Sequence, residues 1–135
     1  MFELTKKDLS LYRLQKSENM LISAKRDMAA KDYASANNRA YYCIFHAMRA
    51  VLALDGEDYK KHSAVISSFS KNYLKTDVFS REYSKLITNA SLIRNRSDYE
   101  DFYLCSQEDT EILLAGAEEF YDVIKAYLDN IFASK

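Results

Sequence analysis

Hydrophobic residues recur every three or four positions along most of this chain, which is the spacing of amphipathic helices. The pattern predicts five helices: residues 6–30, 33–54 and 63–75, a fourth that follows Asp77 and ends near residue 98, and a fifth that opens at Ser106. Short connections between long helices favour antiparallel neighbours. We therefore predict an all-α fold, an up-and-down antiparallel bundle of four long helices plus one short helix.

Polar residues stand where these helices should begin. The candidate N-caps are Thr5, Asp32, Asp77 and Ser106. Asp8 and Asp109 each follow a hydroxyl residue by three positions, as in a capping box. Gly56 supplies a stop after the second helix. The apolar stripes predict a core that includes Leu11, Leu14, Leu21, Met48, Phe79, Ile87, Ile112 and Phe120.

The composition indicates a single globular domain without β-sheets. The 135 residues suit one domain, residues 1–135, and the sequence has no proline and two glycines, too few for the turns of a β-rich fold. Apolar residues make up 48% and charged residues 29%, as in soluble globular proteins. No apolar run approaches the roughly 20 residues of a membrane span, and the first residues do not resemble a signal peptide. Cys43 and Cys105 form no disulfide framework. We expect a cytoplasmic protein without membrane contact.

The charge is unevenly distributed although the net charge is only −1. Residues 60–96 carry eight Lys or Arg and two acidic residues, whereas residues 107–135 carry seven acidic residues and two lysines. These blocks predict either one basic and one acidic face or two solvated helix surfaces that complement each other.

Arg94 and Asn95 are the first candidates for chemistry. Arg94 follows the last apolar residue of the fourth helix, and a guanidinium at the edge of a buried face can grip a phosphate. Asn95 offers an amide, and Tyr99 a hydroxyl about one turn away. Asp98, four residues after Arg94, allows the alternative of an ordinary helix-surface salt bridge.

Aromatic and histidine residues form a second group. Tyr41 and Tyr42 are adjacent, so they should point to different sides of their helix. His46 lies four residues after Tyr42 and is interpreted as a packing residue, while His62 precedes the third helix and could help it start. Cys43 and His46 are three residues apart, but no further ligand pair supports a metal site, and neither glycine lies in a phosphate-binding loop. We expect neither a metal nor a cofactor.

Three segments in order resemble a prokaryotic HEPN domain. They are residues 38–45 (NRAYYCIF), 61–63 (KHS) and 94–99 (RNRSDY), and the resemblance covers roughly residues 18–128. The subgroup it most resembles is the small stand-alone HEPN proteins often encoded beside a minimal nucleotidyltransferase. HEPN domains are helical bundles that are usually dimeric, and many are metal-independent RNA endonucleases with paired active sites at the dimer cleft.

The family motif is an arginine, a polar residue, three variable residues and a histidine. Arg94 and Asn95 match it, but Tyr99 occupies the histidine position. Tyrosine, with a pKa of about 10, is a poor base at neutral pH. In related toxin–antitoxin pairs the nucleotidyltransferase silences the HEPN toxin by adenylylating a tyrosine near the motif. Tyr99 and Tyr103 are the tyrosines near the motif here, although neither stands at the matching position.

Three hypotheses follow from the residues and the resemblance. The first is a toxin-like RNase, dimeric through its second or fourth helix, in which Arg94 steadies the phosphate, Asn95 orients it and Tyr99 replaces the histidine. The second is a non-catalytic domain that binds RNA or a nucleotide, or that partners a nucleotidyltransferase. The third is a plain interaction module. The resemblance assigns nucleotide or RNA binding to Arg39, Tyr42, Lys61, His62 and Arg96.

Overall fold

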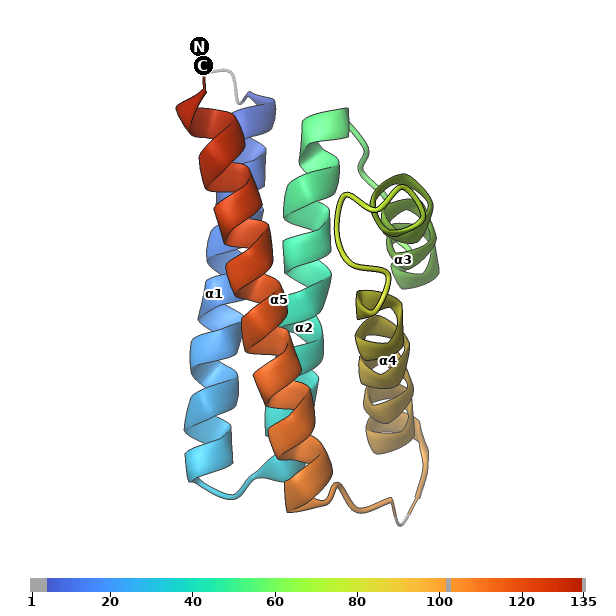
Figure 1. Cartoon of the computed structure of the whole chain (residues 1–135). Coiled ribbons are helices and arrows are strands. Elements are labelled where there is room, and N and C mark those ends of the chain that lie inside the picture. Colours follow the sequence, from blue (N-terminus) through green and yellow to red (C-terminus); the bar gives the residue numbers. More distant parts are fainter. Residues whose placement is uncertain (1–4, 102, 135) are drawn as a thin grey trace.

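The computed structural model describes residues 5–101 and 103–134, and its regular elements in these ranges are all helical. Its α-helices are α1 (Lys6–Ala29), α2 (Tyr33–Leu52), α3 (His62–Phe69), α4 (Tyr83–Tyr99) and α5 (Gln107–Ala133). The 3₁₀ turn η1 (Ala53–Asp55) extends α2, and the π-helical turn η2 (Ser70–Leu74) extends α3. Figure 1 shows α1, α2 and α5 as long neighbours, with α3 and α4 following each other along α2. The all-α bundle is confirmed.

Three of the four predicted caps are confirmed. The Thr5 hydroxyl accepts a hydrogen bond from the Asp8 N–H at 3.0 Å, and the Asp8 carboxylate accepts one from the Thr5 N–H at 3.1 Å. Asp32 caps α2 and Ser106 caps α5 in the same i to i+3 pattern. These bonds satisfy N–H groups that have no partner within the helix.

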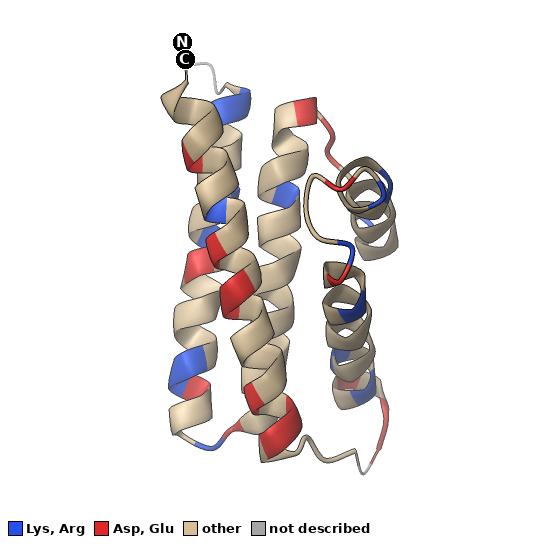
Figure 2. Ribbon diagram, in the orientation of Figure 1, with Lys and Arg blue, Asp and Glu red and all other residues tan. Residues whose placement is uncertain are grey.

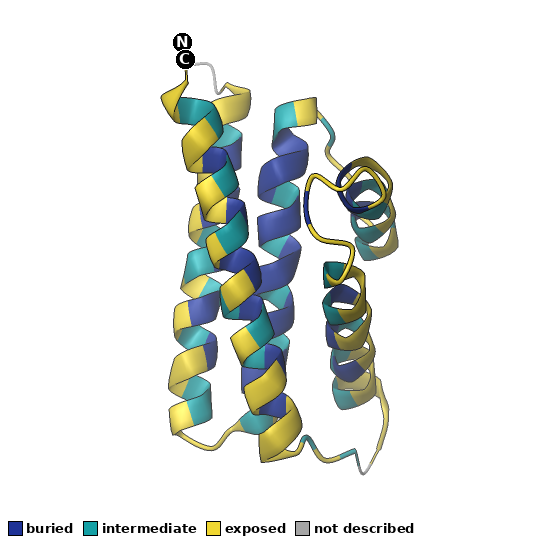
Figure 3. Cartoon of the chain, viewed as in Figure 1, coloured by how far each residue is buried: buried dark blue, intermediate teal, exposed yellow. Residues whose placement is uncertain are grey.

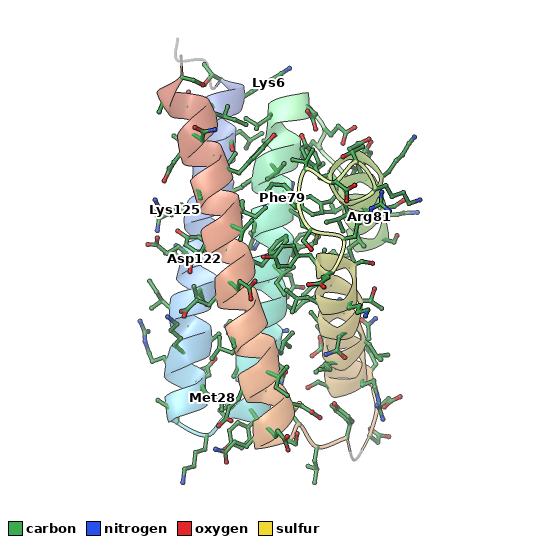
Figure 4. All side chains as sticks on the ribbon, viewed as in Figure 1. Lys6, Met28, Phe79, Arg81, Asp122 and Lys125 are labelled. Carbon is green, nitrogen blue, oxygen red and sulfur yellow. The ribbon has the colours of Figure 1, made fainter. Side chains whose placement is uncertain are left out.

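The predicted start of the fourth helix is wrong. Asp77 does not cap it, because α4 begins at Tyr83. Asp77 instead has a φ of 60°, a left-handed conformation that aspartate tolerates better than most residues, and it pairs with Arg81 at 3.0 Å. Phe79 lies in this loop rather than on a helix, but it is 4% exposed and packs on Phe69. Figure 4 labels Phe79 and Arg81 on the loop.

Helix α2 is the centre of the core. It is buried along most of its length, whereas α1 and α5 show an exposed outer side (Figure 3). Alanines at positions such as 40, 47 and 50 let the neighbouring helices approach closely. Ser10 and Ser17 of α1 donate to the carbonyl oxygens of Ala50 and Cys43, each at 2.7 Å, so their buried hydroxyls are satisfied.

Two residues predicted for the core are exposed. Leu11 is 40% and Ile112 is 61% exposed. Leu14 of the same stripe on α1 and Phe120 of the same stripe on α5 are buried as predicted. Neighbouring positions on a helix point about 100° apart, so Leu11 and Ile112 lie beside the buried faces of their helices rather than on them.

A buried arginine connects α1 to the loop that follows α2. Arg13 of α1 is 4% exposed and donates to the Arg49 carbonyl and to the Asp58 carboxylate, which ties the loop after α2 to the bundle. Cys43 and Cys105 are free thiols. Among the helices in the described ranges, none combines the length and the apolar character that crossing a membrane requires.

Candidate functional site

An open groove of about 640 Å³ runs between α3–η2 and α4. Hydroxyl groups and cationic side chains dominate its wall, and within residues 5–101 and 103–134 no acidic side chain lines it. The lining residues are Tyr41, His62, Ser63, Ile66, Ser67, Ser70, Lys71, Lys75, Ser84, Thr88, Ser91, Arg94 and Asn95. Such a wall is suited to an anionic ligand.

Helical spacing places these polar groups on facing sides. On α4 the groove residues Ser84, Thr88, Ser91 and Asn95 follow one another at intervals of three or four, so they share one face. The buried residues of the same helix, such as Ile87, lie on its other side. The polar face of α4 therefore lines the groove, and its apolar face packs against the bundle.

Arg94 lies against the rings of the two adjacent tyrosines of α2. Its guanidinium carbon lies 5.4 Å from the ring centre of Tyr41 and 5.6 Å from that of Tyr42, within the range of cation–π attraction. Its Nη2 donates to the Tyr42 hydroxyl at 3.3 Å. The side chain is 18% exposed, so it is packed by its neighbours yet open toward the groove.

The predicted pair between Arg94 and Asp98 is also present. Nε of Arg94 lies 3.2 Å from Oδ2 of Asp98. The Nε–H has no hydrogen-bond partner in the described part of the chain, so this contact is an ion pair without hydrogen-bond geometry. The salt bridge and the groove position therefore coexist, and the bridge helps to orient the guanidinium.

His62, the first residue of α3, lies in the same groove. Its Nδ1 is 2.7 Å from the Tyr41 hydroxyl, and its ring centre is 4.2 Å from that of Phe45. Burial, followed by the charges of Arg94 and Arg49, lowers the pKa of His62. Burial raises the pKa of Tyr41 to about 12. At neutral pH the pair is therefore a neutral imidazole and a protonated phenol.

The structure brings together some of the residues singled out in the sequence. Arg94, Asn95 and His62 line the groove, Tyr42 contacts Arg94, and Lys61 is the exposed N-cap residue of α3 beside His62. These residues come from three consecutive helices, α2, α3 and α4, which fold back on one another to bring them together.

Other candidates lie outside the groove lining. Tyr99 ends α4 and is 76% exposed, and its five-residue offset from Arg94 turns it about 140° away around the helix. Arg39 is exposed and bonds to Asn38. Arg96 pairs with Glu100 at 3.0 Å and lies over the ring of Tyr103.

His46 fits the interpretation as a packing residue. Its ring lies 5.9 Å from that of Tyr42 and 5.6 Å from that of Phe45, and it is absent from the groove lining. Burial lowers its pKa to about 4. His46 is therefore neutral over most of the pH range in which the protein would work.

Sequence reasoning missed Lys71, Lys75 and the serines of the groove. The basic block of residues 60–96 held the signal for the lysines. Lys71 lies in η2, and α4 carries further Lys and Arg residues, whereas several acidic residues lie on α5 (Figure 2). The serines carried no signal of their own, because they form a wall only where α3–η2 lies against α4.

Comparison with known proteins gives the family. The HEPN domain model matches residues 10–127, and the chain therefore belongs to the HEPN domain family. Two proteins of Methanocaldococcus jannaschii, each named a putative toxin, are similar to it at 33% and 30% identity over 115 residues. These matches cover 85% of this chain in both cases, and 85% and 78% of the two relatives. A protein named UPF0332 protein, from Thermotoga maritima, is 27% identical over 120 residues, which is 89% of this chain and 91% of the relative.

Proposed function

We propose that this HEPN protein is a toxin-like, metal-independent endoribonuclease and one half of a two-component system whose other half is a nucleotidyltransferase. The observation that carries the proposal is the position of Arg94, packed against two tyrosines in a groove lined by cationic and hydroxyl groups. The names of the two similar putative toxins support the same direction.

The groove offers RNA more than one phosphate contact. Arg94 is already oriented by Tyr42 and Asp98, so it would lose little side-chain freedom when it binds a phosphate. Asn95 can donate from its amide, and Lys71 and Lys75 lie along the same wall. Binding of this kind is mainly electrostatic and weakens with added salt.

We further propose that the protein acts as a homodimer, packed through α2 or α4 so that two copies of Arg94 approach each other. Under this proposal the groove of one protomer continues into that of its partner. Sedimentation at micromolar concentration tests it, and a monomer would contradict a composite site.

A second candidate function is RNA or nucleotide binding without cleavage. The observation that favours it is Tyr99, which stands at the histidine position of the family motif but is 76% exposed and outside the groove lining. The same exposure makes Tyr99 the better candidate for modification by a nucleotidyltransferase, because the ring of Tyr103 lies against Arg96. A plain interaction module would need neither the groove nor Arg94.

Incubation of the purified protein with total cellular RNA in EDTA tests the proposal. We expect the wild type to cleave RNA and Arg94→Ala to cleave at least about 100-fold more slowly, since a preorganised cation at the reacting phosphate is lost. Arg26→Ala, an exposed arginine of α1, is the matched control and should cleave as the wild type does.

The outcomes separate the candidates. Equal cleavage by the wild type and Arg94→Ala contradicts a site at Arg94. If neither cleaves and RNA binding still depends on Arg94, the non-catalytic function replaces the nuclease. If the protein neither binds nor cleaves RNA, the remaining hypothesis is that it is a protein-interaction module.

A further inference from the structure

We propose that His62, held in place by Tyr41, is the general base of this groove and takes the proton from a ribose 2′-hydroxyl. The inference rests on the proposed RNA cleavage and names the group that performs proton transfer where the family motif has Tyr99. It also fixes the substrate class, since DNA lacks the 2′-hydroxyl.

Tyr41 joins His62 and Arg94 into one unit. Its hydroxyl is 2.7 Å from Nδ1 of His62, and its ring lies 5.4 Å from the guanidinium carbon of Arg94. Tyr41 itself is 1% exposed, so this shared support is fixed by the core. A group that binds phosphate and a group that can move a proton are thus positioned by the same buried side chain.

The surroundings of His62 orient its ring for one role. When Nδ1 carries the proton, it donates to the Tyr41 hydroxyl and leaves the lone pair on Nε2. No hydrogen bond from Nε2 is found to any residue in the described ranges, so that atom is available to a ligand in the groove. The ring of Tyr41, stacked on the imidazole, and that of Phe45, tilted 30° to it, restrict the plane of the imidazole. A base oriented by a third group is the usual arrangement in proton transfer.

Charges around His62 favour the neutral form that a base needs. Tyr41, Tyr42, His46 and Arg49 face it from α2, and Arg94 faces it from α4. Burial and the two arginines lower the pKa of His62. The two lysines of the groove offer flexible ammonium groups, which are suited to phosphate binding.

The reaction balances without a metal or a redox partner. Nε2 of His62 accepts the proton of the 2′-hydroxyl as the 2′-oxygen forms a bond to the adjacent phosphorus. The bond from phosphorus to the 5′-oxygen breaks, and that oxygen leaves with a proton from water. The products are a 2′,3′-cyclic phosphate and a 5′-hydroxyl. His62 then returns its proton to solvent, and Arg94 neutralises the phosphate throughout.

A cleavage and binding assay on one short single-stranded RNA tests the assignment. The protein is incubated with the RNA in EDTA, and a second RNA carries a single 2′-deoxyribose at the mapped cleavage site. We expect His62→Gln to slow cleavage by about 10²–10⁴-fold while RNA affinity changes by less than about threefold. The deoxy substrate should bind but stay intact.

Two further variants test whether a loss of cleavage in His62→Gln reflects the loss of the base or the loss of the fold. His46→Gln changes the other histidine, which lies outside the groove, and should cleave as the wild type does. Tyr41→Phe keeps the buried ring and removes only the hydroxyl. It should lower the rate at neutral pH and change the acidic limb of the pH–rate profile, since the partner of Nδ1 is gone. In the wild type this limb falls only below the ordinary pKa of histidine, because protonated His62 is no longer a base.

The outcomes distinguish this inference from the proposed function. If the wild type does not cleave RNA, both fail. If Arg94→Ala is inactive but His62→Gln cleaves at the wild-type rate, only the role of His62 is overturned. Cleavage of the deoxy substrate at the same site overturns it as well. If His62→Gln does not fold, the pH profile of Tyr41→Phe decides, and a profile identical to that of the wild type counts against the assignment.

Discussion

The bundle consists of two regions that are built differently. In the first, α1, α2 and α5 pack along their lengths, each has a side-chain N-cap, and 12 of the 20 residues of α2 are buried. In the second, α3, η2 and α4 cover one side of α2, and only three of the 17 residues of α4 are buried. Neither α3 nor α4 has a side-chain N-cap within the described ranges, and the loop between them contains Asp77 in a left-handed conformation.

The candidate site lies in the second region, where fewer residues are buried. The groove is walled by the second region, and among the described residues Tyr41 is its one lining residue from the first. Elements with few buried contacts open more easily than the core, and ligand-binding segments are commonly drawn from them. The well-packed helices α1, α2 and α5 thus support the less buried helices α3 and α4. Tyr41, which is buried in α2, contacts both Arg94 and His62 and so holds them in position.

Loss of Phe120 should have the largest effect, because this residue joins the two regions. Phe120 lies on α5, is fully buried, and its ring centre is 5.8 Å from that of Phe69 and 5.2 Å from that of Tyr83. We expect Phe120→Ala to lower the free energy of unfolding by about 3–5 kcal/mol through lost burial and a cavity. Denaturant unfolding followed by circular dichroism measures it.

Ile112→Ala, on the exposed side of the same helix, is the control. Ile112 is 61% exposed, so its truncation should change the free energy of unfolding by less than about 0.5 kcal/mol. Equal losses in the two variants would mean that α5 does not link the regions in this way.

A larger side chain at Gly116 should separate the regions without unfolding the first. A Cβ at Gly116 of α5 would lie 2.5 Å from the Cδ1 of Leu86 on α4. Gly116→Leu is therefore expected to push α4 outward at a cost of about 1–3 kcal/mol. Hydrogen exchange should quicken at the amides of α4 and stay unchanged in α1 and α2, and RNA binding through Arg94 should weaken.

Gly116→Ala is the matched control. The end of the Leu86 side chain can rotate away from one methyl group, and alanine favours the helix by about 1 kcal/mol over glycine, so this variant should be close to neutral. Faster exchange spread evenly over all helices in Gly116→Leu would show that the two regions unfold as one.

The first region could be predicted from the sequence largely because its signals are local. Thr5, Asp32 and Ser106 act on N–H groups three residues away, so a short stretch of sequence contains both partners. The start of α4 could not be predicted in this way. Phe79 is buried by Phe69 and Tyr127, residues distant in the chain, and a buried loop residue looks like a helix residue when only its hydrophobicity is known.

The candidate site likewise contains some contacts that the sequence predicts and others that it does not. Arg94 and its pair with Asp98 lie within one helical turn and were visible in the sequence. The contact between Tyr41 and His62 joins residues 21 positions apart, and the wall of serines depends on how α3 lies against α4. Such contacts follow from tertiary packing, and a single sequence contains no local signal for them.

The smallest effect we predict concerns pH and His46, a partly buried residue of α2. Burial is the main reason that its pKa is lowered to about 4, and the charges of Lys16, Arg49, His62 and Arg13 act in the same direction. Because histidine in the unfolded chain has a pKa of about 6.5, the unfolded state binds more protons than the folded state between these values. The free energy of unfolding should therefore decrease as the pH falls from 6.5 toward 4.

His46→Gln isolates this contribution. His62 and the carboxylates titrate in both proteins, so the difference between the two pH dependences belongs to His46. Since the ring is only partly buried, we expect the loss of stability between pH 7 and pH 4.5 to be smaller in the variant by about 1–2 kcal/mol. Urea titrations at the two pH values measure it. Parallel losses in both proteins would mean that His46 accepts a proton in the folded state as readily as in the unfolded one, and that its surroundings on α2 are more open to water than its contacts with Tyr42 and Phe45 indicate.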